Sequence, residues 1–129
     1  MHELAISETI CKIIEKEAKN RNMEKVRTAK LKIGVMNAFQ RENLDLCLKD
    51  YAKNPLMAEM QFVIEEVPVK LECTKCNHNF TDDRFADHDF AHKVAHAPAL
   101  YLPPACPTCK CESIKLISGN EMKLVSIEA

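Results

Sequence analysis

Two Cys-x-x-Cys pairs, Cys73–Cys76 and Cys106–Cys109, constrain this chain more than any other feature of its sequence. A Cys-x-x-Cys turn places two thiolates about one tetrahedral edge apart, and two such turns close a zinc site of four thiolates with Zn–S distances of about 2.3 Å. Because the protein itself then fills all four positions, no position is left for a substrate. The pairs therefore predict a structural zinc site whose ligands are Cys73, Cys76, Cys106 and Cys109.

The other cysteines leave alternatives open. The chain has 7 cysteines in 129 residues, and an odd number argues against a disulfide framework. Pairs with metal-ligand spacing indicate a reducing compartment, so we expect a cytoplasmic protein. Cys111 is either a competing ligand or a free thiol, and His78 is either solvated or a replacement for a thiolate in acid. Cys11 and Cys47 fall on apolar helix faces and are expected in the core.

Hydrophobic periodicity outside the cysteine module predicts an α+β fold. Apolar residues recur every three or four positions over 4–23 and 40–53, as in amphipathic helices. They alternate with polar residues over 29–35 and 60–71, as in half-buried strands. Gly34 indicates a bulge or close packing, and Pro68 an edge or a bend. The end of the chain predicts two short strands around a Ser-Gly-Asn turn.

The order of these elements predicts an inserted module, because the last strand is needed to complete the sheet. We expect a small three-stranded sheet packed with two helices, formed by residues 1–71 with 114–129. A zinc-ribbon-like domain with four cysteine ligands, residues 72–113, interrupts it. The segment between the two cysteine pairs is longer than a compact zinc ribbon needs, so residues 84–105 are predicted to be an extended, histidine-containing insertion.

Three histidines in this insertion have helical spacing. His88, His92 and His96 lie four residues apart, so that on a helix neighbouring imidazoles share a face. Such pairs can chelate a transition metal; the alternative is that all three are solvated. Pro98 and Pro103 would end the helix and return the chain to the second cysteine pair.

The first residues offer a second set of metal ligands. The amine of Met1, the deprotonated amide nitrogen of His2 and its imidazole form fused five- and six-membered chelate rings. Three nitrogens in a plane suit Ni(II) or Cu(II) better than tetrahedral zinc. Glu3 either adds an oxygen ligand or favours the positive end of the first helix. A fourth position would be filled by Glu3 or by an insertion imidazole, with His92 or His96 favoured because they lie later in the insertion.

Taken together, these parts resemble a known family. The start MHEL, the strand ending in KIG, the paired knuckles and the tail SGNEMKLVSIE are similar to the HypA/HybF metallochaperones of hydrogenase nickel incorporation. The resemblance covers nearly the whole chain, although Lys110 stands where the family usually has glycine. It implies a nickel metallochaperone without catalytic turnover that binds Ni(II) through Met1, His2 and Glu3, in the α/β domain formed by residues 1–71 with 114–129. It also implies zinc ligands at Cys73, Cys76, Cys106 and Cys109.

The resemblance further implies delivery of nickel during maturation of nickel–iron hydrogenase, and sometimes urease. The expected partners are a HypB-like, nickel-handling GTPase of that pathway and the hydrogenase large subunit, and a homodimer is left open.

Composition argues against several other classes of protein. The net charge of −1 without a dense basic run argues against nucleic acid, and frequent charges interrupt every apolar stretch that could span a membrane. The start also lacks the pattern of a secretion signal.

Two alternatives come from other functional classes. One is a zinc-ribbon adaptor for nucleic acid or protein, which would need a basic face with aromatic platforms to bind a nucleic acid strand. The other is a metallohydrolase built on the insertion histidines, which would need a general base beside an open metal position. Asp87 and Asp89 are the acidic residues nearest to those histidines in sequence, and their presence alone does not establish such a site.

Overall fold

The computed structural model describes residues 2–129, apart from the side chain of residue 2, and places them in two compact units. Unit 1 contains the chain up to Lys32 together with Phe39–Glu65 and Met122–Ala129. Unit 2 contains Ile33–Ala38 and Glu66–Glu121. None of the helices among the described residues is long and apolar enough to cross a membrane. We describe each unit separately.

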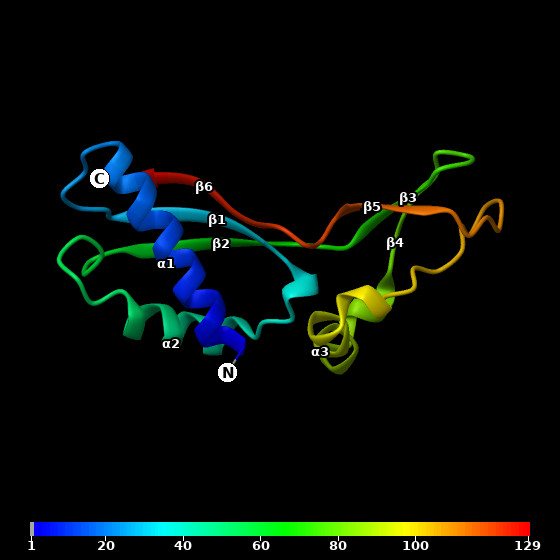
Figure 1. The fold of residues 1–129 in the computed structure, drawn as a ribbon, viewed down its shortest axis with the longest axis horizontal. Coiled ribbons are helices and arrows are strands. Elements are labelled where there is room, and N and C mark those ends of the chain that lie inside the picture. The colour runs from blue at the N-terminus through cyan, green and yellow to red at the C-terminus, as the bar shows by residue number, and fades with distance from the viewer. Residues whose placement is uncertain (1) are drawn as a thin grey trace. The chain divides into compact units, whose positions relative to one another are not determined.

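Unit 1 is a three-stranded sheet with two helices, as the sequence predicts (Figure 1). The strand order is β2-β1-β6, so the last strand of the chain does complete the sheet. Helix α1 packs against α2 and against β6. The elements are α1 (His2–Asn20), β1 (Thr28–Gly34), α2 (Arg41–Tyr51), β2 (Gln61–Val67) and β6 (Met122–Glu128).

The core of unit 1 explains why these segments become helices. The apolar stripe of α1 is fully or almost fully buried at Ile6, Ile10, Ile14 and Ala18. Leu44 and Leu48 of α2 and Leu31 of β1 are buried as well. Each large side chain that leaves water contributes roughly 1.5–3 kcal/mol, far more than helix propensity alone supplies. Cys11 is fully buried in α1, as expected for a core residue, whereas Cys47 in α2 is only half-buried.

Unit 2 is a second sheet of order β4-β3-β5 with a short helix (Figure 1). Strand β3 pairs antiparallel with both neighbours, so that Leu71 lies opposite Phe80 on one side and Leu116 on the other. The elements are β3 (Lys70–Cys73), β4 (Asn79–Thr81), α3 (His88–His96), β5 (Ile114–Ser118) and the 3-10 helices η1 (Val35–Asn37), η2 (Asp83–Ala86) and η3 (Pro98–Leu100). Its core consists of Ala38, Val69, Leu71, Phe85, Ala91 and Val94.

The unit boundaries differ from the predicted domain boundaries on both sides of the cysteine module. Segments 66–71 and 114–121 lie in unit 2, because β3 and β5 form its sheet. The apolar run 60–71 is in fact two strands in different sheets, divided at Pro68, which lacks an N–H for a sheet ladder. The last two strands are likewise divided between the sheets, around Gly119. That unit 1 is the part of the protein that binds nickel stays a prediction.

The prediction of close packing at Gly34 is confirmed. A Cβ atom at Gly34 would overlap the carbonyl oxygen of Gly119. The N–H of Gly34 donates to the carbonyl of Glu121 over 2.8 Å, and that of Met36 to the carbonyl of Gly119 over 2.9 Å. Gly119 has a φ of +121°, and its own missing Cβ leaves room for Val69. Both glycines are therefore required by backbone geometry.

We expect the substitution Gly34→Ala to destabilise the protein by about 1–3 kcal/mol, because the added methyl group meets backbone atoms that cannot rotate away. The free energy of unfolding, measured by urea denaturation and far-UV circular dichroism, checks this. Lys32→Ala, at an exposed position of the same strand, is the control and should change stability by less than about 0.5 kcal/mol. Equal unfolding midpoints for the two variants would contradict the packing argument.

Candidate metal centre

The first cysteine pair forms a compact turn at the end of β3. The N–H of Cys73 donates to the carbonyl of His78 over 3.0 Å, and the N–H of Asn77 donates to the carbonyl of Cys73 over 2.9 Å. Asn77 has a φ of +61°, in the left-handed region that asparagine tolerates better than most residues. This backbone conformation bends the chain around the two sulfurs.

The second pair repeats the same backbone design. The N–H of Cys106 donates to the carbonyl of Cys111, and the N–H of Lys110 donates to the carbonyl of Cys106, each over 2.9 Å. Lys110 has a φ of +64°, equivalent to that of Asn77. Glycine adopts this conformation without strain, whereas a lysine there costs roughly 1–2 kcal/mol. The geometry therefore favours a glycine at this position on physical grounds.

Pairing of β3 with β5 brings the two turns together. Cys73, the last residue of β3, lies opposite Ile114, the first residue of β5. Beyond the strand ends, the N–H of Thr74 donates to the carbonyl of Ser113 over 3.0 Å, and their hydroxyl oxygens lie 2.7 Å apart. These hydrogen bonds therefore hold the segment after the second turn beside the first turn.

The four sulfurs form one cluster whose size fits zinc. One sulfur from each of Cys73, Cys76, Cys106 and Cys109 lies within 4.8 Å of all the others. The Cys73–Cys109 and Cys76–Cys106 sulfur pairs are 3.5 and 3.6 Å apart. A tetrahedron with Zn–S distances of about 2.3 Å has edges of about 3.8 Å. Four thiols at this spacing match the donor set that zinc prefers.

Backbone amides prepare the first sulfur of each turn for a cation. The N–H group of Cys76 is the largest influence on the pKa of the Cys73 thiol; with the N–H group of Lys75 and the neighbouring thiols it outweighs burial and lowers that pKa to about 6. Burial raises the pKa of Cys106, but the N–H groups of Cys109 and Thr108 outweigh it, and the net pKa is lowered. A lowered pKa means that these sulfurs more readily become the thiolates that bind metal.

The structure places Cys111 and His78 at equivalent positions of the two turns. The carbonyl of each closes its turn, so the backbone of Cys111 has the role that the backbone of His78 has in the first turn. The Cys111 sulfur accepts a hydrogen bond from the N–H of Ser113 over 3.4 Å and does not belong to the four-sulfur cluster. The His78 ring stacks on Phe80, with 6.1 Å between the centroids.

The insertion histidines do lie on one helix. Helix α3 spans His88–His96, and the side chain of Asp87 caps it by accepting the N–H of Asp89 over 2.9 Å. The His92 and His96 rings are 4.5 Å apart between centroids, and those of His88 and His92 are 5.9 Å apart. The predicted shared face is therefore present in unit 2.

The predicted N-terminal ligands are only partly within the described structure. Met1 lies outside the described residues, and of His2 only the backbone is described, as the first residue of α1. Glu3 is in the first turn of this helix, where a carboxylate is favoured by the helix dipole, and its carbonyl accepts the Ser7 hydroxyl over 2.8 Å. The terminal chelate accordingly stays a prediction.

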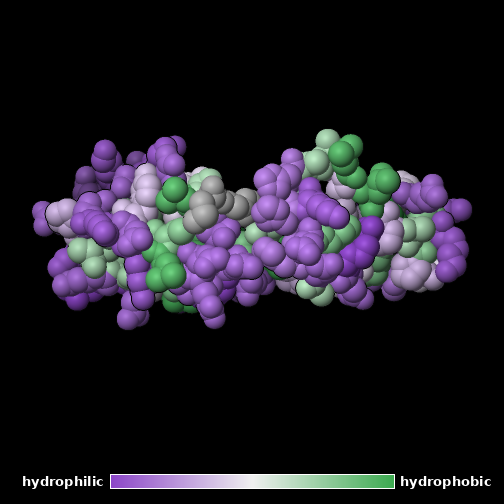
Figure 2. All heavy atoms as spheres, turned by 90° about the horizontal axis from the view of Figure 1, so that it is seen from below, coloured by the Kyte–Doolittle hydropathy of each residue, from purple (hydrophilic) through white to green (hydrophobic). Residues whose placement is uncertain are grey.

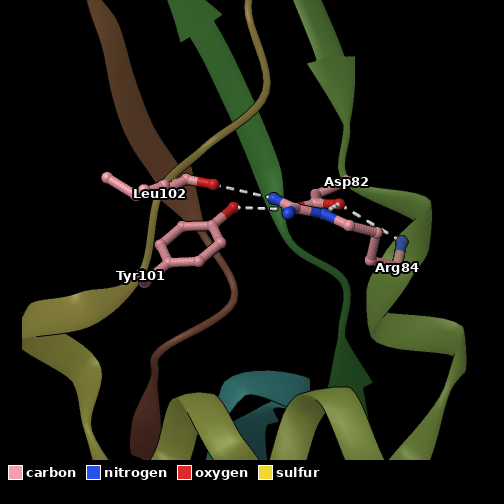
Figure 3. A network of polar contacts seen from close by, with 4 residues as sticks. All are labelled: Asp82, Arg84, Tyr101 and Leu102. Carbon is pink, nitrogen blue, oxygen red and sulfur yellow. Dashed lines mark hydrogen bonds and ion pairs between the residues drawn. The ribbon is translucent and has the colours of Figure 1, made fainter.

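A polar network in unit 2 has no counterpart in the sequence analysis (Figure 3). Asp82 is only 5 % exposed. Its carboxylate forms an ion pair with the Arg84 guanidinium, with 2.8 Å between nitrogen and oxygen, and accepts a hydrogen bond from the Tyr101 hydroxyl over 2.7 Å. Arg84 also donates to the carbonyl of Leu102 over 2.8 Å. These contacts tie the segment before the second cysteine pair to the turn after β4. No spacing rule connects residue 82 with residue 101, so the sequence carried no signal for the network.

Aromatic contacts surround this network. The Arg84 guanidinium lies 4.7 Å from the centre of the Phe90 ring, and Phe85 makes edge-on contacts with Phe90 and Tyr101. Burial raises the pKa of Asp82, but the bonds from Arg84 and Tyr101 outweigh it and hold the pKa below its ordinary value. The carboxylate is therefore kept ionised inside an aromatic setting.

The fold and the four-thiol cluster define a small α+β metal-binding protein. The family model described as "Hydrogenase/urease nickel incorporation, metallochaperone, hypA" matches residues 1–129. The chain therefore belongs to the HypA family of nickel metallochaperones, which serve hydrogenase maturation and are not catalysts.

Relatives agree with this assignment, and a solved structure shares the fold. The chain is 30 % identical over 129 residues to the hydrogenase maturation factor HypA of Solidesulfovibrio magneticus, covering 99 % of this chain and 98 % of that protein. It is 27 % identical over 128 residues to HypA of Rhodopseudomonas palustris (strain BisA53), with the same coverage. The solution structure of the Ni metallochaperone HypA from Helicobacter pylori has a similar fold, with a TM-score of 0.64, 21 % identity and coverage of 99 % and 97 % of the two chains.

The Asp82 network generates a pH-dependent prediction. Tyr101→Phe should destabilise the protein by about 1–2 kcal/mol at pH 7, since it removes a hydrogen bond to a charged group. Asp82→Asn should lower the free energy of unfolding at pH 7 by more than Tyr101→Phe does. Because the folded-state pKa of Asp82 lies below its ordinary value near 3.9, its stabilising effect is complete above about pH 4. It is lost as the pH falls through the folded-state pKa, so the difference between wild type and Asp82→Asn should narrow in acid.

Guanidinium unfolding at a series of pH values measures both effects. Asp83→Asn is the matched control, because Asp83 is the exposed neighbour of Asp82. A constant difference between wild type and Asp82→Asn from pH 7 down to pH 3 would show that the ionised carboxylate is not what holds this segment.

Proposed function

We propose that the four-cysteine cluster holds one structural zinc ion, with Cys73, Cys76, Cys106 and Cys109 as ligands. The observation that carries this is the mutual approach of the four sulfurs within 4.8 Å at the ends of two equivalent turns. Zinc bound there would offset part of the negative charge of the four thiolates and close the loop between residues 73 and 109. With all four positions taken by protein, the role is to hold unit 2 in shape.

We propose that the cargo, Ni(II), binds at the start of the chain. The ligands are the amine of Met1, the amide nitrogen and imidazole of His2, and a fourth group that is Glu3 or an insertion imidazole, His92 or His96. Family membership supports nickel as the cargo, and a planar nitrogen set supports the choice of ligands. A terminal chelate also exchanges readily, because its nitrogens can be reprotonated or displaced by an acceptor.

The bound nickel would then be delivered, in the cytoplasm, during maturation of nickel–iron hydrogenase and in some cases urease. The partners that this requires are a HypB-like GTPase of the maturation pathway and the hydrogenase large subunit. Membership of a family described by hydrogenase and urease nickel incorporation supports this pathway. Weak, exchangeable binding of nickel and tight, closed binding of zinc are the two opposite demands that such a carrier combines.

Zinc binding is tested by single cysteine substitutions. Cys73→Ser should lose zinc and destabilise unit 2, because a hydroxyl is a far poorer zinc ligand than a thiolate. Cys111→Ser is the matched control and should retain one zinc per chain, since its sulfur lies outside the cluster. Elemental analysis and X-ray absorption measure metal content and ligand type. Zinc retained by Cys73→Ser and lost by Cys111→Ser would overturn the ligand assignment.

Nickel binding is tested at the N-terminus. His2→Ala should abolish specific nickel binding and leave zinc content unchanged, because the two sites share no residue. One residue added before Met1 should weaken binding severely, since the primary amine becomes an amide. Affinity should fall below about pH 6.5, where an unperturbed imidazole takes up its proton.

Isothermal titration with protein that keeps the free amine of Met1 measures the nickel affinity, and His88→Ala serves as the histidine control. If the extended protein binds nickel as tightly as the native one, the terminal chelate is wrong.

A further inference from the structure

Two leucines of unit 2 are exposed to an unusual degree. Leu100 and Leu102, in the segment that returns from α3 to the second cysteine pair, are each 79 % exposed. Figure 2 shows hydrophobic side chains gathered on the surface of this unit. Single exposed apolar residues are ordinary, but adjacent large ones are characteristic of interaction sites.

A buried anchor holds the backbone between these two leucines. Tyr101, between them, has an extended backbone and points inward, where its hydroxyl donates to Asp82 over 2.7 Å. Leu100 is the last residue of the 3-10 helix η3, and Leu102 follows Tyr101 on its other side; both leucine side chains are exposed. The guanidinium of Arg84 also donates a hydrogen bond to the carbonyl of Leu102 (Figure 3). The buried ion pair therefore anchors the backbone between two exposed leucines.

A groove of about 550 Å³ lies beside the two leucines. Most of its wall is apolar, and none of the ten described residues that line it is acidic. Arg84 and Lys93 supply its fixed positive charges. Arg84 is neutralised by Asp82, whereas no ion pair of Lys93 occurs among the described residues, so the groove has an uncompensated cation. The apolar wall is formed by Phe90, Val94, Ala97, Leu100, Tyr101 and Leu102.

We propose that this groove, with Leu100 and Leu102, binds an apolar segment of a partner protein that carries acidic residues beside its anchor side chains. Apolar anchors would fill the groove and cover the leucines, and a carboxylate would pair with Lys93. Because the bonds to Asp82 and Arg84 already anchor the backbone between the leucines, less backbone entropy is lost on binding. His92 and His96, the candidate fourth nickel ligands, also line the groove. The inference nevertheless goes beyond the proposed function, since binding of the segment requires neither zinc nor nickel.

The shape of the surface favours a protein segment over two other occupants. A flat bilayer surface cannot fill a concave groove, although it could accept two leucines beside a cation. In a symmetric contact between the grooves of two copies, neither groove would offer an acidic lining residue to pair with the cation of the other. Both occupants are outcomes of the test below.

Synthetic peptides test the proposal with the full chain. The probe is a fluorescein-labelled amphipathic peptide with leucines at helical positions i, i+3, i+4 and i+7 and glutamates between them. Its controls replace all glutamates by lysines, or all leucines by alanines. Fluorescence anisotropy should show binding of the Leu/Glu peptide in preference to both controls.

Variants then locate the site. The double substitution Leu100→Ser/Leu102→Ser should weaken Leu/Glu binding at least about tenfold. Lys93→Glu should weaken it about two- to fivefold at low salt and improve binding of the Leu/Lys peptide. Leu46→Ser is the matched control, because Leu46 is an ordinary exposed leucine on α2, at 63 % exposure, and should leave binding unchanged. Zinc content and nickel affinity are measured for each variant, so this proposal and the metal sites can fail separately.

Four results would overturn the proposal. They are the absence of Leu/Glu peptide binding, equal binding of all three peptides, equal weakening by Leu46→Ser, and binding that persists without Leu100 and Leu102. Leucine-dependent binding to phosphatidylserine vesicles without peptide binding would instead assign the surface to a membrane. Leucine-dependent dimerisation in sedimentation experiments, unaffected by the Leu/Glu peptide, would assign it to a second copy.

Discussion

The antiparallel pairing of β3 with β5 is the interaction on which unit 2 depends. Each Cys-x-x-Cys turn offers only two thiols, and a tetrahedral metal site needs both turns in one place. The pairing provides this, because β3 ends at Cys73 and β5 begins just beyond Cys111, with Thr74 bonded to Ser113 between them. The strands and the cluster thus depend on each other: the sheet aligns the sulfurs, and a metal bound to the sulfurs would prevent the strand ends from separating.

The long insertion between the turns is ordered by a different principle. Its apolar side chains form a small aromatic cluster, and within that cluster a buried carboxylate, Asp82, receives bonds from Arg84 and Tyr101. A buried ion pair is often no more stabilising than apolar packing, but it is directional. Here direction matters, because the same contacts hold the Tyr101 hydroxyl inward and anchor the backbone between two exposed leucines. The insertion therefore presents a defined surface.

Local patterns were sufficient to predict the helices, the four clustered cysteines and the shared histidine face of α3. Each of these depends on residues within a few positions of one another. The division of the run 60–71 between two sheets was missed, because alternation in β2 and β3 looks continuous and only the partners of each strand separate them. The role of Cys111 was left open, because its backbone carbonyl closes the second turn, whereas the cysteine spacing in the sequence is informative only about sulfur ligands. The Asp82–Tyr101 bond joins residues with no common pattern at all.

The topology of unit 1 has a consequence for how the protein is made. Its central strand, β1, is complete by residue 34, but one of its two neighbours, β6, is not synthesised until residue 128. Chains leave the ribosome from the N-terminus, at about 5–20 residues per second, so β1 must wait several seconds with one edge unpaired. During that wait all the cysteine residues of unit 2 emerge. The segments of unit 2, which end at Glu121, therefore all precede β6 in synthesis, whereas the sheet of unit 1 closes only after β6 has been made.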